Sequence, residues 1–359
     1  MIDEIYFSVG SYHSHWRQRD QMRLVAQREA RYYSTVVPMS NWQPVPVYNG
    51  AMVAQHWGQI GEAIGDIQPQ PRILMTVQIT PRTIPQDIIS AHEQGARIAK
   101  VFARYTPRME YGIADFSDPQ FHKNLATAED LGMSVAIHCE LPCLDTRGYD
   151  MFSSERDFIP ILADLVGAHP GLPVSVEHIS NPEMLDFVRE TAQDCPGMII
   201  GGLTLHHATM TSGDFWDKKN REKSGLTNSY FYCRPVLQTN SNRVAVLEAM
   251  VSGEECFDFG PDSAYHSAEA KEGENPPAGI YFPPEIAIPT LVEVFEHSGD
   301  GWQERMEKFA CRNGEKFYGL TPTDRRVRVV REDWQVPPEM DGTRPARAER
   351  TLHWRLAAA

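Results

Sequence analysis

Short apolar runs alternate along the chain with longer segments in which apolar residues recur every three or four positions. The short runs predict β-strands, because each is bounded by Gly, Pro, Asn or Asp. They cover residues 5–9, 35–39, 73–79, 97–102, 134–138, 174–178, 198–205 and 256–260. The longer segments have the spacing of amphipathic helices. Two of them begin where a capping side chain precedes a proline, at Asp118 and Asn181.

Eight strands that alternate with helices predict an α/β fold of the (β/α)8 TIM-barrel type. We expect residues 1–320 to form this barrel as one catalytic domain, without an added β-sandwich domain. Residues 321–359 are rich in Arg and Pro and are expected to form a C-terminal tail packed on the barrel surface. The alternative is an open, doubly wound sheet. The nucleotide-binding sequences typical of that fold, G-x-G-x-x-G and the P-loop, do not follow the first strand.

Composition narrows the possible functions. Apolar residues make up 42% and charged residues 23% of the chain, which is typical of a globular protein. The formal net charge of −14 argues against a nucleic-acid partner, because phosphates attract clusters of Lys and Arg. No apolar run is long enough to cross a membrane, and residues 1–5 are too polar for a secretory signal. Six scattered cysteines indicate reduced thiols, so we expect a cytoplasmic location and no membrane partner.

Polar side chains gather where the predicted strands end. In a parallel barrel these ends meet at one mouth, where barrel enzymes hold their active sites. The residues at or near these positions are His13, His15, Asn41, Lys100, His138, His178, His206, His207, Asp262 and His266. The chain has 13 histidines among 359 residues, and a random distribution would rarely place one at so many strand ends.

His13 and His15 are two positions apart. In an extended chain both imidazoles project from the same face, so both can bind one metal ion. An isolated pair of this kind is also compatible with a polar strand end that faces solvent. His138 and His178 each close an apolar run on successive strands. This repeated position favours a metal site over the alternative of single histidines buried in the core.

Asp262 and Lys100 each allow more than one interpretation. Asp262 directly follows an apolar strand, where a carboxylate could cap a helix, or bind a metal and move a proton. Lys100 lies within an apolar strand, and burial would lower the pKa of its ammonium group. Alone it would suggest a snorkelling side chain or a Schiff-base amine. Beside four histidines and an aspartate, it could also be carboxylated by CO2 and bridge two metal ions.

The motifs around these residues resemble those of the amidohydrolase superfamily and, more closely, of dihydroorotases of the compact bacterial type. Residues 13–17 (HSHWR) resemble H-x-H-x-R, residues 38–41 (PMSN) resemble M-P-N, and residues 132–140 (GMSVAIHCE) resemble G-M-x-x-x-x-H-x-E. Residues 177–179 (EHI), 232–237 (YCRPVL) and 260–266 (GPDSAYH) resemble E-H-I, Y-C-x-P-x-L and G-T-D-S-A-P-H. With residues 317–320 and 351–354, the resemblance covers nearly the whole chain.

The resemblance implies a centre with two Zn²⁺ per subunit. The implied metal ligands are His13, His15, Lys100, His138, His178 and Asp262. The H-x-H pair and the aspartate would hold one ion, and the two single histidines would hold the other. Carboxylated lysine and a hydroxide would bridge the two ions.

The resemblance also implies the reaction and the substrate contacts. Asp262 would be the catalytic proton carrier, and Arg17, Asn41 and His266 would hold the substrate carboxylate. The implied enzyme is a binuclear zinc cyclic amidohydrolase of pyrimidine biosynthesis that interconverts dihydroorotate and N-carbamoyl-aspartate. We expect a small carboxylate-bearing cyclic amide as its ligand and a homodimer as its assembly.

Three departures from the family pattern leave alternatives open. Residues 103–109 (ARYTPRM) have one threonine where the family has adjacent threonines, and Pro261 and Tyr265 replace Thr and Pro around the aspartate. Arg234 occupies a position that is usually apolar, so we include it among the candidate substrate-binding residues. These differences suit a sister amidohydrolase that opens another carboxylate-bearing cyclic amide, imide or lactone. A non-catalytic barrel scaffold is the second alternative, and it predicts missing metal ligands.

Overall fold

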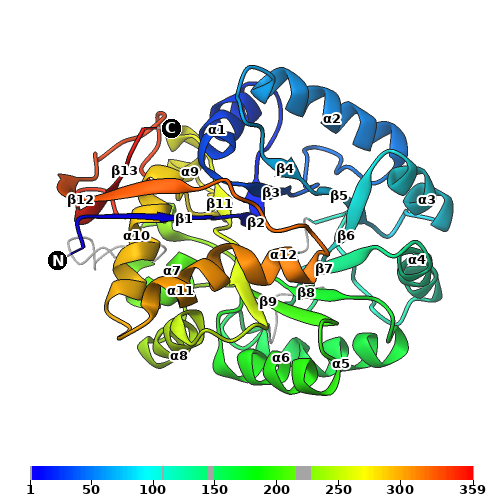
Figure 1. The fold of residues 1–359 in the computed structure, drawn as a ribbon. Helices are drawn as coiled ribbons and strands as arrows, with labels where there is room; N and C mark the ends of the chain where they lie inside the picture. The colour runs from blue at the N-terminus through cyan, green and yellow to red at the C-terminus, as the bar shows by residue number, and fades with distance from the viewer. Residues whose placement is uncertain (1, 107–108, 144–148, 216–227, 359) are drawn as a thin grey trace.

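The computed structural model describes residues 2–106, 109–143, 149–215 and 228–358 (Figure 1). Eight strands form the wall of a barrel, and they share one direction within each of two parallel ladders. They are β2 (Ser11–His15), β3 (Thr35–Pro38), β5 (Met75–Ile79), β6 (Ala96–Phe102), β7 (Ser134–His138), β8 (Val174–Val176), β9 (Ile199–Leu203) and β10 (Phe257–Phe259).

The two ladders meet at two seams in the barrel wall. One ladder has the order β10-β9-β8-β7-β6-β5, and the other has the order β11-β2-β3-β4, with β11 (Ser263–Ala264) and β4 (Arg72–Ile73) as short edge strands. At one seam Thr76 Oγ1 donates to Pro38 O at 2.7 Å. At the other, Asp262 N donates to His13 O at 3.0 Å. The predicted (β/α)8 fold is confirmed, although its ladder of strands is not continuous.

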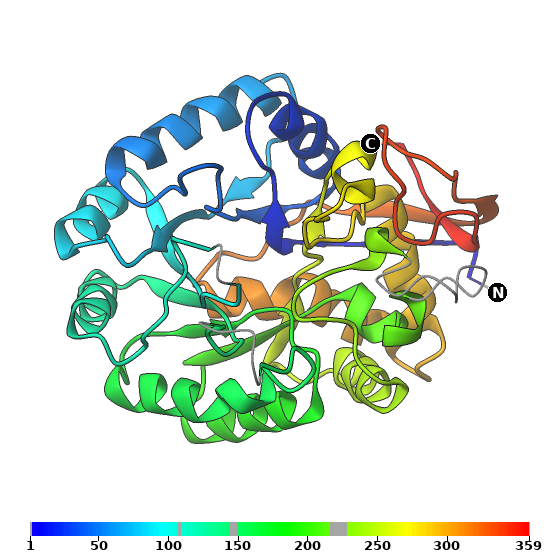
Figure 2. The ribbon, with the colours of Figure 1, turned by 180° about the vertical axis from the view of Figure 1, so that it is seen from behind.

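Helices cover the barrel, most of them around its outer side and one, residues 313–317, across the middle of the view in Figure 1 (Figures 1 and 2). They are α1 (Arg19–Tyr32), α2 (Gly50–Ile64), α3 (Pro85–Glu93), α4 (Pro119–Asp130), α5 (Ile159–Ala168), α6 (Pro182–Asp194), α7 (Leu205–Thr209), α8 (Asn240–Val251), α9 (Ala268–Glu272), α10 (Pro284–Glu296), α11 (Trp302–Glu307) and α12 (Asn313–Phe317). The predicted helix starts are confirmed: Asp118 accepts from Gln120 N at 2.8 Å, and Asn181 accepts from Met184 N at 3.0 Å.

The prediction that residues 5–9 form the first barrel strand is wrong. That segment contains β1 (Glu4–Phe7), which pairs antiparallel with β12 (Val327–Gln335). β12 pairs in turn with β13 (Thr351–Leu356), so the three strands form a small sheet beside the barrel (Figure 1). Ile5 and Phe7 of β1 are buried while Glu4 and Tyr6 are exposed, the alternation of a sheet covered on one face.

The first barrel strand is β2, whose residues are mostly polar. All five of its positions are buried, so apolar periodicity could not identify it. Ser14 Oγ and Trp16 Nε1 donate to the Glu29 carboxylate of α1 at 2.5 and 2.7 Å. This buried acceptor holds β2 against α1. His13 and His15 therefore lie within a strand and not after it.

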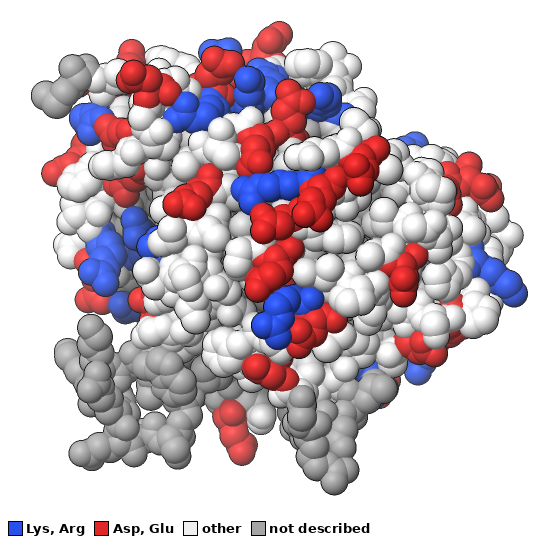
Figure 3. All heavy atoms as spheres, turned by 90° about the horizontal axis from the view of Figure 1, so that it is seen from below, with Lys and Arg blue, Asp and Glu red and all other residues white. Residues whose placement is uncertain are grey.

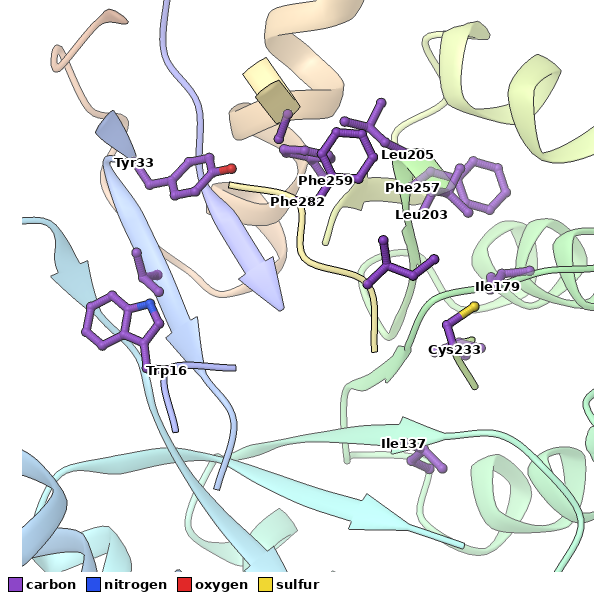
Figure 4. Packing of buried hydrophobic residues seen from close by; sticks show 14 of the residues in the cluster. Trp16, Tyr33, Ile137, Ile179, Leu203, Leu205, Cys233, Phe257, Phe259 and Phe282 are labelled. Atoms are coloured by element: carbon purple, nitrogen blue, oxygen red, sulfur yellow. The ribbon is translucent and has the colours of Figure 1, made fainter. Parts of the chain in front are cut away.

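Apolar side chains fill the space between the strands and the outer helices. Figure 4 shows Phe259, Leu205 and Phe282 beside one another, with Phe257 and Leu203 close by. All five side chains are fully buried. Such close packing keeps the strand ends in fixed positions.

The surface agrees with the acidic composition. On the face shown in Figure 3, acidic side chains are spread widely, with basic side chains among them. A nucleic-acid-binding face would instead gather Lys and Arg. Among the described helices, none has both the length and the apolar character needed to cross a bilayer.

Candidate metal centre

One half of the predicted metal centre is formed by β2 and the segment after β10. The Nε2 atoms of His13 and His15 lie 3.3 Å apart. Asp262 Oδ1 lies 2.9 Å from His15 Nε2 and 3.4 Å from His13 Nε2. All three side chains are buried, and their ligand atoms lie within 4.8 Å of one another. The spacing suits one metal ion held by two imidazoles and a carboxylate.

The other half of the centre is formed by β7 and the segment after β8. His138 Nδ1 and His178 Nε2 lie 3.0 Å apart, and the two rings are inclined at 70°. The ring centroids of His178 and His13 are 5.2 Å apart, so the two halves adjoin. Asp262 (φ 47°) and His178 (φ 43°) both have a left-handed backbone. Such strained conformations are common at functional sites.

Lys100 is the third element of the centre. It lies in β6, pairs with Ala136 of β7, and therefore faces the same side of the sheet as His138 two residues further on. Its side chain is fully buried, and Nζ has no hydrogen-bond partner. Glu177 Oε2 lies 3.8 Å from Nζ.

Burial lowers the pKa of the Lys100 ammonium group, although Glu177 and Asp262 oppose this shift. A lower pKa favours the neutral amine, which is the form that can react with CO2. A buried amine with no hydrogen bond, and with its carboxylate contact at 3.8 Å, is a costly arrangement for a bare ammonium ion. The residues present therefore fit a metal centre bridged by a modified lysine.

Three of the four imidazoles are each oriented by a hydrogen bond on one ring nitrogen, the one that points away from the other candidate ligands. His13 Nδ1 bonds to the Glu177 carboxylate, and His138 Nε2 bonds to Glu140 Oε2 at 2.6 Å. His15 Nδ1 bonds to Asn41 Oδ1 at 3.1 Å. In each ring the other nitrogen faces a neighbouring candidate ligand, where a metal ion would bind. Sequence reasoning quoted Glu140 and Glu177 within the family motifs but gave them no role.

Burial and the neighbouring side chains together set the pKa values of two carboxyl groups in this network, Asp262 and Glu177. Burial alone would raise the pKa of the Asp262 carboxyl, but the His13 and His15 imidazoles hold it well below its usual range. Burial would likewise raise the pKa of Glu177, yet Lys100 and His13 bring it down to about 2. Both carboxylates are therefore ionised at neutral pH.

The candidate substrate residues line a pocket at the barrel mouth. Its volume is about 280 Å³, and its walls also include His15, His138 and His178. Arg17 Nη2 lies 2.8 Å from His266 Nε2, which is also 3.1 Å from Ala278 O. Burial lowers the pKa of Arg17 to about 10 and, together with the Arg17 cation, that of His266 to about 2. At neutral pH Arg17 is therefore charged and His266 is neutral.

Arg234 lies in the same pocket wall, bound to a carboxylate. Its Nη2 lies 2.7 Å from Glu140 Oε1 and its Nε lies 3.1 Å from Glu140 Oε2. The guanidinium also bonds to the Tyr149 hydroxyl and lies 5.1 Å from the Tyr105 ring centroid. Glu140 is the partner of His138, so Arg234 helps to fix that imidazole. Its direct contact with substrate stays a prediction.

Replacing Arg234 by Leu should destabilise the fold. The variant leaves the Glu140 carboxylate buried without its cation, which costs about 3–5 kcal/mol in the free energy of unfolding. Adding Glu140→Gln to Arg234→Leu should recover most of that loss, because the charge is removed. Urea unfolding measures both effects.

The matched control is Lys316→Met, which breaks an exposed ion pair with Glu255 and should change the unfolding free energy by less than about 1 kcal/mol. An Arg234→Leu protein as stable as the wild type would contradict the buried pair.

His206, His207 and Cys233 form a second buried group whose ligand atoms lie close enough for a metal ion. Both ring nitrogens of His207 already have hydrogen-bond partners. Nδ1 lies 2.9 Å from Thr204 Oγ1, and Nε2 lies 3.0 Å from Pro235 O. Burial also raises the pKa of the Cys233 thiol, which disfavours the thiolate. These contacts indicate that His207 supports the backbone after Arg234.

His206 differs from His207 because neither of its ring nitrogens has a hydrogen-bond partner. Its Nε2 lies 3.9 Å from Asp262 Oδ2, so it borders the candidate centre.

In the segment of residues 103–112, Tyr105 stacks on His138 with ring centroids 4.6 Å apart. Residues 107–108 of that segment lie outside the described residues, so a closing lid there stays a hypothesis.

The chain is similar to dihydroorotases both in sequence and in fold. The chain is 33% identical to a dihydroorotase from Aromatoleum aromaticum over 354 residues, which covers 96% of each chain. It is 32% identical over 358 residues to a dihydroorotase from Nitrosomonas europaea, again with 96% of each covered. The crystal structure of dihydroorotase from Saccharomyces cerevisiae in complex with 5-fluoroorotic acid shares the fold, with a TM-score of 0.87, 22% identity and 99% of each chain covered. No protein-family model matches the sequence.

Proposed function

Because the chain belongs to the dihydroorotase family, we propose that it interconverts dihydroorotate and N-carbamoyl-aspartate. The family makes it a metal-dependent hydrolase that acts on a C–N bond of a cyclic amide. The main observation in support is the convergence of six buried candidate ligands at one mouth of the barrel. They are His13, His15, Lys100, His138, His178 and Asp262.

In the proposed centre, His13, His15 and Asp262 would hold one zinc ion, and His138 and His178 would hold the other. Lys100, carboxylated on Nζ, would supply oxygen ligands to the centre. Two zinc ions bound there would lower the pKa of water and polarise the amide carbonyl of the substrate. Nitrogen and carboxylate donors in a buried setting suit zinc. Glu177, Glu140 and Asn41 fix the imidazole orientations, so the ligands need little rearrangement on binding.

Asp262 is the proposed proton carrier. Its Oδ1 faces His15 and its Oδ2 lies on the side of His206, so its two oxygens lie in different surroundings. In the hydrolytic direction, water oxygen adds to the ring carbonyl carbon and the carboxylate takes the proton that water loses. The same proton then passes to the ring nitrogen as the C–N bond breaks. Ring closure follows the reverse order.

Arg17, Asn41 and His266 are the proposed carboxylate clamp. Arg17 keeps its charge despite burial and can offer two parallel N–H donors. Its present partner is the neutral His266 imidazole, whose Nε2 is also near Ala278 O. A neutral ring cannot both accept from Arg17 and donate to that carbonyl through one nitrogen. A substrate carboxylate would resolve the conflict by taking the guanidinium.

Arg17→Gln should raise KM for dihydroorotate by at least about tenfold, because the carboxylate loses its charged partner. The value of kcat should fall less, since the reacting amide lies elsewhere in the pocket. Steady-state kinetics measures both constants. Arg19→Gln, two residues away and exposed, is the control that should leave both unchanged. An unaltered KM in the Arg17 variant would contradict the clamp.

The proposal is tested most directly with purified, zinc-loaded enzyme and with both dihydroorotate and N-carbamoyl-aspartate. Turnover in either direction supports it. Loss of turnover on chelation, with recovery when zinc is returned, supports the metal assignment. A zinc-replete sample that converts neither compound would eliminate the dihydroorotase activity.

One sister function has a structural observation in its favour. Residues 103–109 and Arg234 depart from the family pattern, and Tyr105 and Arg234 line the substrate pocket. An enzyme that opens another carboxylate-bearing cyclic amide, imide or lactone would keep the metal ligands and change this wall. A non-catalytic scaffold would bind no metal, so a measured metal content near zero would favour it.

Assembly, location and domain limits complete the proposal. We propose a homodimer, which light scattering in solution can test, and a cytoplasmic location, which the six free cysteines support. We further propose that residues 1–320 form the catalytic domain, with β1 outside the barrel wall, and that residues 321–359 pack on this domain as a tail. The pairing of β12 with β1 supports such a packed tail.

A further inference from the structure

A second cavity adjoins the metal pocket at the barrel mouth. We call it the outer chamber. Its walls come from residues 41–44, Pro46, Gln78 of β5, Phe102 and Tyr105, and residues 109–111, and its volume is about 400 Å³. Asn41, Gln43, Phe102 and Tyr105 line both cavities. The two spaces are therefore neighbours separated by a shared wall of four side chains.

The inner pocket already contains every group that the proposed reaction needs. The candidate metal ligands His15, His138, His178 and Asp262 line it, together with the clamp residues Arg17 and His266. A single ring that carries one carboxylate requires no more than these contacts. The outer chamber is the larger of the two cavities, so it offers room for a further part of the substrate.

The side chains that line the outer chamber suit an uncharged group. Trp42, Phe102, Tyr105 and Tyr111 supply aromatic surface, and Met109 supplies a flexible apolar side chain. Among the described residues that line it, the only charged one is Glu110. Glu110 is exposed and lies 4.0 Å from Arg82.

Two buried polar atoms of the chamber wall have no partner. They are Trp42 Nε1, a donor, and Gln78 Oε1, an acceptor. Trp42 is 4% exposed and Gln78 is 3% exposed, so bulk water reaches neither side chain freely. Unpaired buried groups cost free energy unless a ligand or water satisfies them. The hydrogen-bonding capacity of this wall is therefore not met by the described atoms of the protein itself.

We propose that the outer chamber is a subsite for an uncharged aromatic arm on the substrate, so that the enzyme also binds and opens cyclic amides whose ring carries such an arm. This inference rests on the proposed function, because it uses the same metal pocket for the ring. With 5-benzyldihydroorotate, whose ring carries both the carboxylate and the arm, water would add to the ring carbonyl, the C–N bond would break, and N-carbamoyl-3-benzylaspartate would form. No further reactant is needed.

The first test compares ligands that share a head group and differ in the arm. Isothermal titration calorimetry of the zinc-loaded enzyme with N-carbamoyl-3-benzylaspartate and N-carbamoyl-3-methylaspartate should give a Kd at least about tenfold lower for the phenyl compound. The kcat/KM for 5-benzyldihydroorotate should exceed that for 5-methyldihydroorotate by a similar factor. Equal Kd values for the two acids would overturn the proposal.

The second test fills the chamber. Met109 lines the outer chamber but not the inner pocket, and it is partly exposed, so Met109→Trp can be accommodated. This variant should remove the preference for the phenyl compound and leave KM for dihydroorotate unchanged. Met151→Trp, at an exposed methionine elsewhere, is the matched control and should keep the preference. A Met109→Trp protein that retains the preference would contradict the subsite.

The two proposals can fail separately. Turnover of dihydroorotate without any preference for the phenyl arm would sustain the proposed function and reject the subsite. A clear phenyl preference in calorimetry, without turnover of dihydroorotate, would sustain the subsite and reject that substrate.

Discussion

Lys100→Ala should lose metal and activity together. The wild-type chain is expected to hold two zinc ions, and the variant at most one, with a fall in kcat/KM of at least about a thousandfold, or about 4 kcal/mol. The physical reason is that carboxylated Lys100 is the ligand that the proposal assigns to both ions, and alanine cannot be carboxylated. Elemental analysis of the purified proteins measures the metal. Bicarbonate should restore neither property.

Lys271 provides the matched control, because it is another buried lysine near the mouth. Its Nζ donates to Pro277 O at 2.9 Å and to Gly279 O at 2.6 Å, so its role is to bind backbone. Lys271→Met should lower stability and keep two metal ions. In wild-type protein prepared with ¹³C-bicarbonate, NMR should detect a carbamate carbon that is missing from Lys100→Ala. Two metal ions in Lys100→Ala would contradict the bridging role.

Asp262→Asn should abolish most of the catalysis while preserving the site. The amide keeps the size of the carboxylate and one oxygen that a metal ion can use, but it cannot accept and release the proton. Loss of general acid–base catalysis alone predicts a fall in kcat of about 10²–10⁴-fold. Metal content and the affinity for N-carbamoyl-aspartate should stay close to wild type, as elemental analysis and calorimetry can measure.

Asp262→Ala separates the two roles of this residue. It removes the ligand oxygen as well as the base, so metal content should fall along with activity. Asp258, a buried aspartate of β10 whose pKa is raised by burial, is the control for a nearby carboxyl: Asp258→Asn should keep both metal ions. If Asp262→Asn retained full kcat, Asp262 would not be the proton carrier.

The local pattern of apolar and capping residues was sufficient to predict much of the fold. Apolar runs located seven of the eight barrel strands to within a few residues, and Asp118 and Asn181 marked helix starts that the structure confirms. The missed strand, β2, is polar because it carries His13 and His15 into the site. A functional strand of this kind breaks the apolar periodicity on which strand prediction depends.

The candidate ligands could be selected from sequence because strand ends in a parallel barrel converge. That topological rule brought together residues as distant in sequence as His13 and Asp262, whose atoms lie 3.4 Å apart. The rule does not say which nitrogen of an imidazole faces inward. Glu140 and Glu177 decide that, and their contacts depend on side-chain geometry that no motif encodes.

The amino-acid sequence by itself determined the alternation of strands and helices, the residue types available for a metal centre, and the family to which these motifs belong. It could do so because periodicity and spacing are local properties of the chain. The tertiary structure alone decided that Arg234 is bound to Glu140, that β1 lies outside the barrel, and that a second cavity opens beside the pocket. Those features depend on distances between segments far apart in the chain, and only packing sets such distances.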